Sequence, residues 1–254
     1  MKLGLLTLNL AKDMDLKTII DLSKEIGFEG VEFRVDKNQK HGVELERTKD
    51  ERKRIKTLFE SEGIEICGIG SGCRYDSLDP KMVKENVART KSLLELTADL
   101  NGKGLKVFGN NFHDAEGIPR AKTVEQVATA VRECGIYAKN FGVELRFEMH
   151  GDFYDYRYAL PVVERAEEAN VTLIYNCDPR DKDIPDVLLR IMKHVTHVHM
   201  HDLTRKYPYI EMLRIFKRNR YKGYFVAEVD EPSSDPIRLM KYYAALWRAY
   251  MKLI

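Results

Sequence analysis

ERKRIKTLFESEGIEICGIG, residues 51–70, contains one complete helix-to-strand unit of the chain. Its first part repeats apolar residues at the spacing of an amphipathic helix. Gly63 then supplies the left-handed cap that turns a helix back toward a sheet. The apolar run IEICGIG that follows has the length of a buried strand. A helix followed directly by such a strand predicts a parallel sheet covered by helices.

The same unit recurs from one end of the chain to the other. Gly27 and Gly142 stand, like Gly63, between a helical segment and the next apolar run. The expected strands begin about 25 to 40 residues apart and are KLGLLTL from Lys2, GVEFRV from Gly30, IEICGIG from Ile64, GLKVFG from Gly104, VELRFEM from Val143, VTLIYNC from Val171, THVHMHD from Thr196 and GYFVAEV from Gly223. Eight alternating units in 254 residues predict an α/β chain that forms one (β/α)8 TIM barrel domain over residues 1–254. A doubly wound open sheet is disfavoured because no G-x-G-x-x-G follows the first run.

Composition excludes several classes of protein. The chain has 42 basic and 40 acidic residues, so its charge of +2 gives no reason to expect nucleic acid as a partner. No apolar run approaches the roughly 20 residues that cross a bilayer, and Lys2–Leu8 is expected as a strand rather than a signal peptide. We therefore expect a cytoplasmic protein without a membrane partner. The four cysteines form no C-x-x-C pair, and Cys67 and Cys177 are expected to be inert core thiols.

Polar residues end four consecutive strands in the second half of the chain. Glu148 ends the fifth expected strand, Asp178 the sixth and Glu228 the eighth, while His199 lies in the seventh. In a TIM barrel the C-terminal ends of the strands form the active site, so these side chains are expected to converge. Three carboxylates and one imidazole predict one divalent metal ion, Mn²⁺, Mg²⁺ or Co²⁺, with Zn²⁺ also compatible.

Other histidines and one glutamate have two possible roles. The alternation of a strand places His197, His199 and His201 on one side at three depths, so only one of them needs to reach a metal. His197 and His201 are left open between the core and the pocket. Glu32 points inward on the second strand, either as an ion pair inside the barrel or as a substrate contact. Three further histidines are expected at the surface: His41, His113 and His194.

These motifs resemble a known family over essentially the whole chain. GFEGVEF at 27–33, the E-x-H-G that starts at Glu148, Asp178, HVHMHD around His199 and Glu228 occur together in the sugar phosphate isomerase/epimerase family of xylose-isomerase-like barrels. The resemblance implies a metal bound by Glu148, Asp178, His199 and Glu228, with Mn²⁺ as the first choice. It also implies that Glu148 and Glu228 act as an acid/base pair on opposite faces of a substrate carbon.

The resemblance also implies substrate contacts. Arg205 matches an arginine that holds substrate oxygens in several relatives, and His150, His201 and Asp181 are further candidates at the mouth. Asp181 stands where family epimerases often have histidine. An anion at this position would repel a phosphate or a carboxylate and would instead accept hydrogen bonds from sugar hydroxyls.

Three functions follow from these residues. The first is an isomerase or epimerase that moves a proton beside the carbonyl of a small keto- or aldo-sugar. The second is a dehydratase acting on an inosose or keto-sugar, in which His150, His201 or Asp181 protonates the leaving hydroxyl. The third is a metal-bearing, sugar-binding subunit without chemistry of its own. The expected partner is a small sugar, and the chain is a candidate homo-oligomer.

Overall fold

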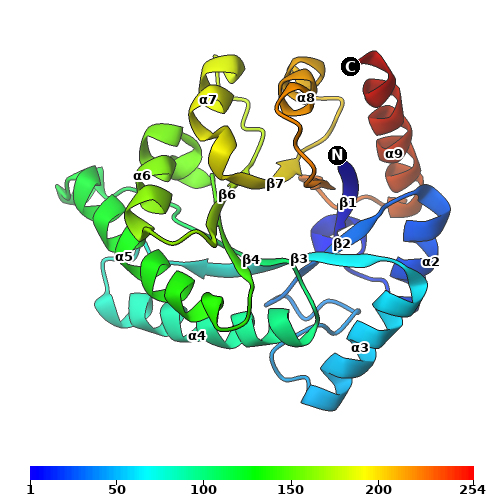
Figure 1. The fold of residues 1–254 in the computed structure, drawn as a ribbon, viewed down its shortest axis with the longest axis horizontal. Coiled ribbons are helices and arrows are strands. Elements are labelled where there is room, and N and C mark those ends of the chain that lie inside the picture. Colours follow the sequence, from blue (N-terminus) through cyan, green and yellow to red (C-terminus); the bar gives the residue numbers. More distant parts are fainter.

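Eight parallel strands close into a barrel in the computed structural model, which describes residues 1–254 (Figure 1). The strands pair in chain order, and the first also pairs with the last, which closes the sheet. They are β1 (Lys2–Leu6), β2 (Gly30–Arg34), β3 (Glu65–Arg74), β4 (Gly104–Phe108), β5 (Glu144–Glu148), β6 (Val171–Tyr175), β7 (Val195–Met200) and β8 (Tyr224–Ala227). Each of the eight overlaps one expected strand, so the predicted TIM barrel is confirmed.

Helices surround the barrel and connect successive strands (Figure 1). They are α1 (Thr7–Leu10), α2 (Leu16–Ile26), α3 (Lys49–Glu62), α4 (Pro80–Asp99), α5 (Arg120–Lys139), α6 (Tyr156–Ala166), α7 (Ile184–Ile191), α8 (Tyr209–Arg218) and α9 (Pro236–Leu253), with short 3-10 turns η1 (Asp114–Glu116), η2 (Gly151–Tyr154) and η3 (Met192–His194). Gly27 and Gly63 end α2 and α3 with φ of 96° and 73°, a conformation that glycine adopts without strain. None of the helices combines the length and the hydrophobicity that a membrane span requires.

The first strand is shorter than the sequence indicates. It was expected to reach Leu8, but it ends at Leu6, and Thr7 begins the single turn α1. The side chain of Thr7 explains this end, because its Oγ1 accepts the backbone N–H of Arg34 at 2.9 Å and donates to Gln39 Oε1 at 2.7 Å. Both bonds draw the chain toward β2 and its following loop instead of continuing the strand.

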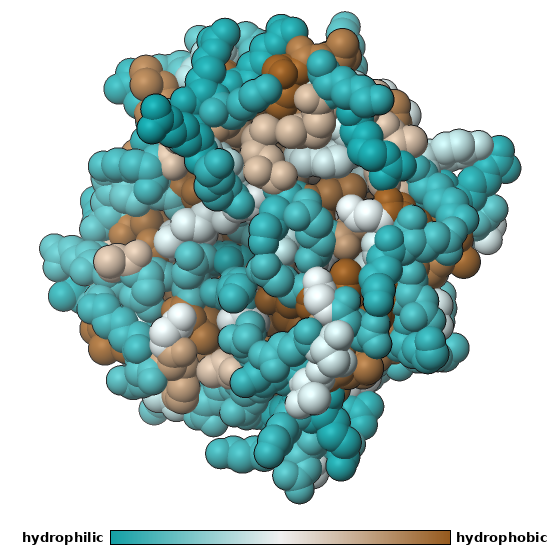
Figure 2. All heavy atoms as spheres, turned by 45° about the vertical axis from the view of Figure 1, so that its right-hand side comes forward, coloured by the Kyte–Doolittle hydropathy of each residue, from teal (hydrophilic) through white to brown (hydrophobic).

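Two separate layers of side chains form the interior. The outward faces of the strands pack against the helices in one core of 66 buried residues. Inside the barrel, only Leu6, Cys67, Tyr224 and Val226 form an apolar cluster, and the rest of the space holds buried charged and polar groups. Cys67 and Cys177 are buried free thiols, as expected. Figure 2 shows hydrophilic side chains over most of one face, with apolar ones scattered between them.

His41 is buried, with only 3% of its surface exposed, so the prediction that it lies at the surface is wrong. Its Nδ1 accepts the backbone N–H of Val43 at 3.0 Å, and its Nε2 lies 2.9 Å from Gln39 Oε1. The neutral ring satisfies both contacts, with the proton on Nε2. Burial lowers the pKa of His41 from 6.5 to about 4.

This burial predicts a loss of stability in acid. The unfolded chain protonates His41 near pH 6.5 and the folded chain near pH 4, so the free energy of unfolding falls as pH drops between these values. The full contribution is about 3 kcal/mol, at about 1.4 kcal/mol per pKa unit. Urea unfolding at several pH values should show a shallower loss for His41→Gln than for the native chain. His113→Gln, outside this pocket, is the control; equal slopes in all three proteins would contradict the prediction.

Candidate metal and active site

Three of the four predicted metal ligands converge at the C-terminal end of the barrel. Glu148 is the last residue of β5, His199 lies in β7, and Glu228 directly follows β8. His199 Nδ1 is 2.7 Å from Glu148 Oε1 and 3.3 Å from Glu228 Oε2. One donor atom from each residue lies within 4.8 Å of the other two. Two carboxylate oxygens and one imidazole nitrogen therefore face a common point.

Asp178, the fourth predicted ligand, is not part of this group and pairs with its neighbour Arg180. Arg180 binds both oxygens of the Asp178 carboxylate, with Nε 2.9 Å from Oδ1 and Nη2 2.6 Å from Oδ2. Arg180 also donates to the carbonyl of Gly151 and lies over the ring of Tyr154, 3.7 Å from its centroid. Partial burial would raise the pKa of Asp178, but Arg180 lowers it below its ordinary value. Arg180 thus engages both oxygens of Asp178, and each oxygen keeps a lone pair for a further partner.

A buried glutamate supports His199 from below. Glu32 Oε2 lies 3.1 Å from His199 Nε2 and 2.7 Å from His197 Nε2. Glu32 is 1% exposed, so its carboxylate lies inside the barrel, where it contacts the two histidines. His197 lies fully inside as well, and its Nδ1 is 3.0 Å from Arg146 Nη1. The candidate substrate contact at Glu32 is thus a buried support for a ligand histidine.

The positions of the protons in this network follow from the chemistry of Arg146, which can only donate hydrogen bonds. His197 Nδ1 must therefore accept, and His197 Nε2–H donates to Glu32. Burial and then the charge of Arg146 lower the pKa of His197 to about 4, so this ring is neutral. Glu32 also accepts from His199 Nε2–H, which directs His199 Nδ1 toward Glu148 and Glu228. A carboxylate behind a ligand histidine fixes its ring and tautomer in this manner.

The Nδ1 side of His199, which faces Glu148 and Glu228, requires a positive charge. A bare Nδ1 lone pair facing two carboxylates would be repelled by both. Burial would lower the pKa of His199, but the carboxylates of Glu32, Glu228 and Glu148 raise it well above its ordinary value. A proton on Nδ1 supplies the required charge, and a divalent cation bound at the same point would supply it as well.

The donor set fits a divalent metal on two counts. Glu228 Oε2 is buried and receives no hydrogen bond, so it has a coordination position to offer. The three carboxylates of Glu32, Glu148 and Glu228 and the one ammonium of Lys106 leave two negative charges when the histidines are neutral. Arg146 is balanced separately by Glu144, with 2.8 Å between Nε and Oε2. Mixed oxygen and nitrogen donors suit Mn²⁺, Co²⁺ and Zn²⁺.

Glu32, His197 and His199 also lie close enough to hold a metal, but their donors are engaged. Both histidines direct N–H groups at Glu32, and the guanidinium of Arg146 occupies the other nitrogen of His197. This second cluster is therefore a hydrogen-bonded support.

One residue of the site was missed by the sequence analysis. Lys106 of β4 places its Nζ 2.7 Å from Glu148 Oε2 and 4.6 Å from the centroid of the Phe108 ring. Its only sequence signal is a charged residue in the apolar run GLKVFG. Burial would raise the pKa of Glu148, but Lys106 and then His199 lower it below its ordinary value. Glu148 is therefore ionised at neutral pH.

The remaining predicted substrate contacts occupy the rim of the mouth. His201 Nδ1 lies 2.9 Å from Asp230 Oδ1, and Arg205 forms an ion pair with the same carboxylate. Asp181 accepts a hydrogen bond from Tyr175 at 3.0 Å, and burial raises its pKa to about 6. His150 is exposed, and its Nδ1 lies 3.0 Å from Asn110 Oδ1.

Asn9 is a further residue that the sequence analysis missed. It follows β1 and donates to the carbonyls of Val229 and Asp230 at 2.8 and 3.0 Å. These bonds fix the chain beyond β8, where Glu228 and Asp230 stand. No motif marks Asn9, because its role depends on contacts about 220 residues away in the chain.

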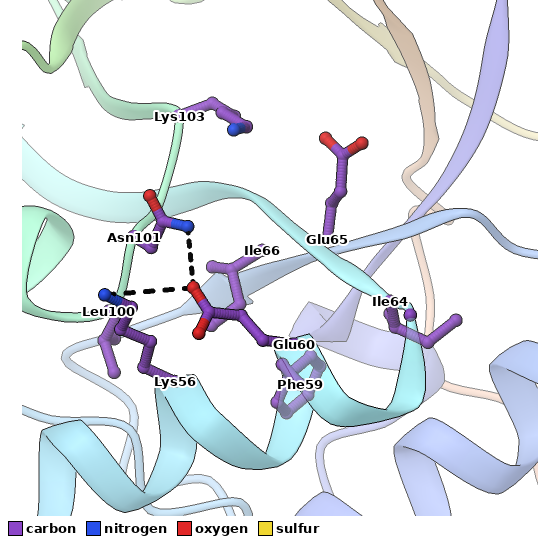
Figure 3. A pocket seen from close by; sticks show the side chains of 10 residues that line it. Lys56, Phe59, Glu60, Ile64, Glu65, Ile66, Leu100, Asn101 and Lys103 are labelled. Carbon is purple, nitrogen blue, oxygen red and sulfur yellow. Dashed lines mark hydrogen bonds and ion pairs between the residues drawn. The ribbon is translucent and has the colours of Figure 1, made fainter.

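A hollow at the other end of the barrel is a poorer candidate. It has a volume of about 210 Å³ and lies between the end of α3 and the starts of β3 and β4, where Figure 3 shows Lys56, Glu60, Glu65, Asn101 and Lys103 around it. Glu60 accepts a hydrogen bond from Asn101 at 2.9 Å. The hollow lies at the N-terminal ends of the strands, which in TIM barrels serve stability rather than catalysis.

Comparison with known proteins gives a family. The profile of the xylose isomerase-like TIM barrel family matches residues 20–250. A comparison with curated protein sequences gives no significant match.

Solved structures share the fold across their whole length. A 3-keto-D-glucoside 4-epimerase from E. coli has a TM-score of 0.81 and 16% identity, covering 98% of this chain and 99% of that one. A D-psicose 3-epimerase from Clostridium cellulolyticum H10, solved with D-tagatose, has a TM-score of 0.78 and 16% identity over 98% and 99% of the two chains. The IolI protein with a bound zinc atom has a TM-score of 0.77 and 14% identity over 99% and 96%. At these identities the likeness establishes the fold.

The buried network predicts a large effect of Glu32→Gln on stability. The amide keeps the shape of the side chain but replaces the carboxylate that accepts N–H groups from His197 and His199. The free energy of unfolding should fall by about 2–3 kcal/mol, the size of a hydrogen bond to a charged group. Urea unfolding in the presence of EDTA measures this effect without metal. Glu29→Gln, at an exposed position just before β2, is the control, and an equal effect of both substitutions would refute the network.

Proposed function

Because the chain belongs to the xylose isomerase-like TIM barrel family, we propose that it is a divalent-metal-dependent enzyme that moves a proton beside the carbonyl of a small sugar. The leading activity is that of an isomerase or epimerase acting on a keto- or aldo-sugar. The observation that carries the proposal is the convergence of Glu148, His199 and Glu228, with one buried oxygen of Glu228 left without a hydrogen-bond donor.

The two glutamates supply the proton transfer. Their strands, β5 and β8, are separated by β6 and β7 around the barrel, so the carboxylates approach the mouth from different sides. Burial would raise the pKa of Glu228, but the charge of His199 lowers it, so this carboxylate is a base at neutral pH like that of Glu148. One carboxylate removes a proton from the carbon beside the carbonyl. The other, once it has taken up a proton from water, delivers that proton to the opposite face, which gives an epimer. Return to the neighbouring carbon gives an isomer.

A cation held by Glu148, His199 and Glu228, with Asp178 as the proposed fourth ligand, would polarise the carbonyl and stabilise charge on its oxygen. The protein holds the ligand set rigid through Glu32, His197 and Arg146 behind His199. Mn²⁺ is the first ion to test, followed by Zn²⁺, Co²⁺ and Mg²⁺. The zinc in the IolI structure and the sugar epimerases among the similar folds support this choice of chemistry.

The rim would bind the hydroxyls of the sugar. Arg205, His201, His150 and Asp181 have polar ends around the mouth, and a sugar hydroxyl can donate to or accept from each of them.

Dehydration of a keto-sugar is the second candidate function, and Asp181 favours it. With a pKa of about 6, this carboxyl holds its proton more readily than an exposed aspartate and can protonate a leaving hydroxyl. The first step, removal of a proton beside the carbonyl, is the same in both reactions.

The metal site predicts about one ion per chain in protein purified without added metal, measured by plasma mass spectrometry. A double variant, Glu148→Gln with Asp178→Asn, should lose the ion because a carboxamide is a weak ligand. The single variant Asp178→Asn then shows whether Asp178 joins the set, and Glu167→Gln, an exposed carboxylate on the outer surface, is the control. A native chain that binds no metal even after addition of Mn²⁺ would sink the proposal.

The proposed roles of the two glutamates predict that the protein exchanges a substrate proton with D₂O. With D-fructose, D-tagatose and D-psicose as probes, the native chain should incorporate deuterium beside the carbonyl, as followed by NMR. Glu148→Gln and Glu228→Gln should each lower the rate by about 10²–10⁴-fold. Products of unchanged mass indicate isomerisation or epimerisation, and products lighter by one water indicate dehydration. Sugar binding with no exchange would instead identify a binding subunit.

A further inference from the structure

Glu148 contacts two groups, one at each carboxylate oxygen: Lys106 at one and the candidate ligand His199 at the other. Its Nζ contacts Oε2 of Glu148 at 2.7 Å, while Oε1 of the same carboxylate lies 2.7 Å from His199 Nδ1. The lysine and the histidine therefore approach Glu148 at its two different oxygens. The oxygen next to Lys106 is the one that does not face His199.

The surroundings of Lys106 leave part of its side chain exposed. Gly70 of β3 and Arg146 of β5 are its register partners, and Gly70 puts no side chain beside it. The Lys106 side chain is 13% exposed, while that of Glu148 is 1% exposed. An ammonium has three N–H donors, and Glu148 is the one hydrogen-bond acceptor that Lys106 has in the protein. Two donors remain for a molecule that enters the mouth.

We propose that Lys106 is a further catalytic residue, which donates a hydrogen bond to the substrate oxygen that becomes negative during proton transfer. This inference rests on the proposed isomerase or epimerase activity. Glu148 takes the proton from the carbon beside the carbonyl, and the electron pair of the C–H bond forms the new carbon–carbon double bond. The π pair of the carbonyl moves onto its oxygen, so the negative charge passes from Glu148 to the substrate.

This transfer changes the partner of Lys106 without changing the charge of the site. Before the step, the ammonium is the counter-ion of the Glu148 carboxylate; after the step, that carboxyl is neutral and the substrate oxygen is the nearest anion. A cation already in place beside the substrate oxygen stabilises the negative charge that develops there, so charge passes from Glu148 to the substrate at a lower cost. If the Lys106–Glu148 contact were only structural, Lys106 would lose its anionic partner at this step and gain no other.

The test compares Lys106→Met, which keeps the length of the side chain and removes its charge, with Lys106→Arg, which keeps the charge. Lys103→Met is the matched control, because Lys103 is exposed just before β4. Deuterium incorporation into D-psicose gives kcat and KM for each protein, and metal content and thermal unfolding confirm that each is loaded and folded. Lys106→Met should lower kcat by about 10²–10³-fold, the size of losing one oxyanion donor, with KM changed less than about 3-fold. Lys106→Arg should recover about 10-fold or more of this loss.

A binding readout separates catalysis from structure. Glycolohydroxamate carries its oxygens in the planar arrangement of an enediolate, so Lys106→Met should bind it about 10-fold or more weakly while binding D-psicose as the native chain does. Equal glycolohydroxamate affinity, or an unchanged kcat in folded and metal-loaded Lys106→Met, overturns the role of Lys106 and leaves the proposed function intact. A native chain with neither metal nor exchange overturns both proposals.

Discussion

The carboxylate of Glu32, buried between His197 and His199, is the interaction on which the site depends. It lies where no water reaches it, so its charge must be met by the N–H groups of the two histidines. This requirement directs Nδ1 of His199 at the mouth, where Glu148 and Glu228 stand. The chemistry of the mouth is thus set one layer below it, by groups that no substrate touches.

The barrel is built to hold this carboxylate. A β-carbon on Gly70 would lie 2.9 Å from Glu32 Oε1, and one on Gly68 would lie 3.3 Å from the same side chain. The wall of β3 therefore has no side chains where Glu32 turns toward the histidines. The charged interior is compatible with a stable fold because the apolar core lies elsewhere, between the outer face of the strands and the helices. Stability and chemistry are thus assigned to opposite faces of the same sheet.

The sequence predicted the barrel and the convergence of three candidate ligands because both follow from periodicity. Apolar runs alternate with helical segments, and a residue at the end of a strand must stand at the mouth, which placed Glu148, His199 and Glu228 correctly beside one another. The pairing of Asp178 with Arg180 and of Lys106 with Glu148 was not predicted. These contacts depend on where long, flexible side chains end, and strand position does not determine that. His41 was misplaced for a related reason, since a loop position gives no signal of burial.

Asp178 and Lys106 show how one site can contain its own counter-ions. Each forms an ion pair with an opposite charge. Asp178 pairs with Arg180, and Lys106 pairs with Glu148. The arginine donates one hydrogen bond to each oxygen of its partner. The lysine contacts one oxygen of Glu148, and the other oxygen faces His199. The two-point pairing therefore holds the Asp178 carboxylate beside Arg180, whereas the one-point pairing leaves one oxygen of Glu148 directed at the proposed metal site.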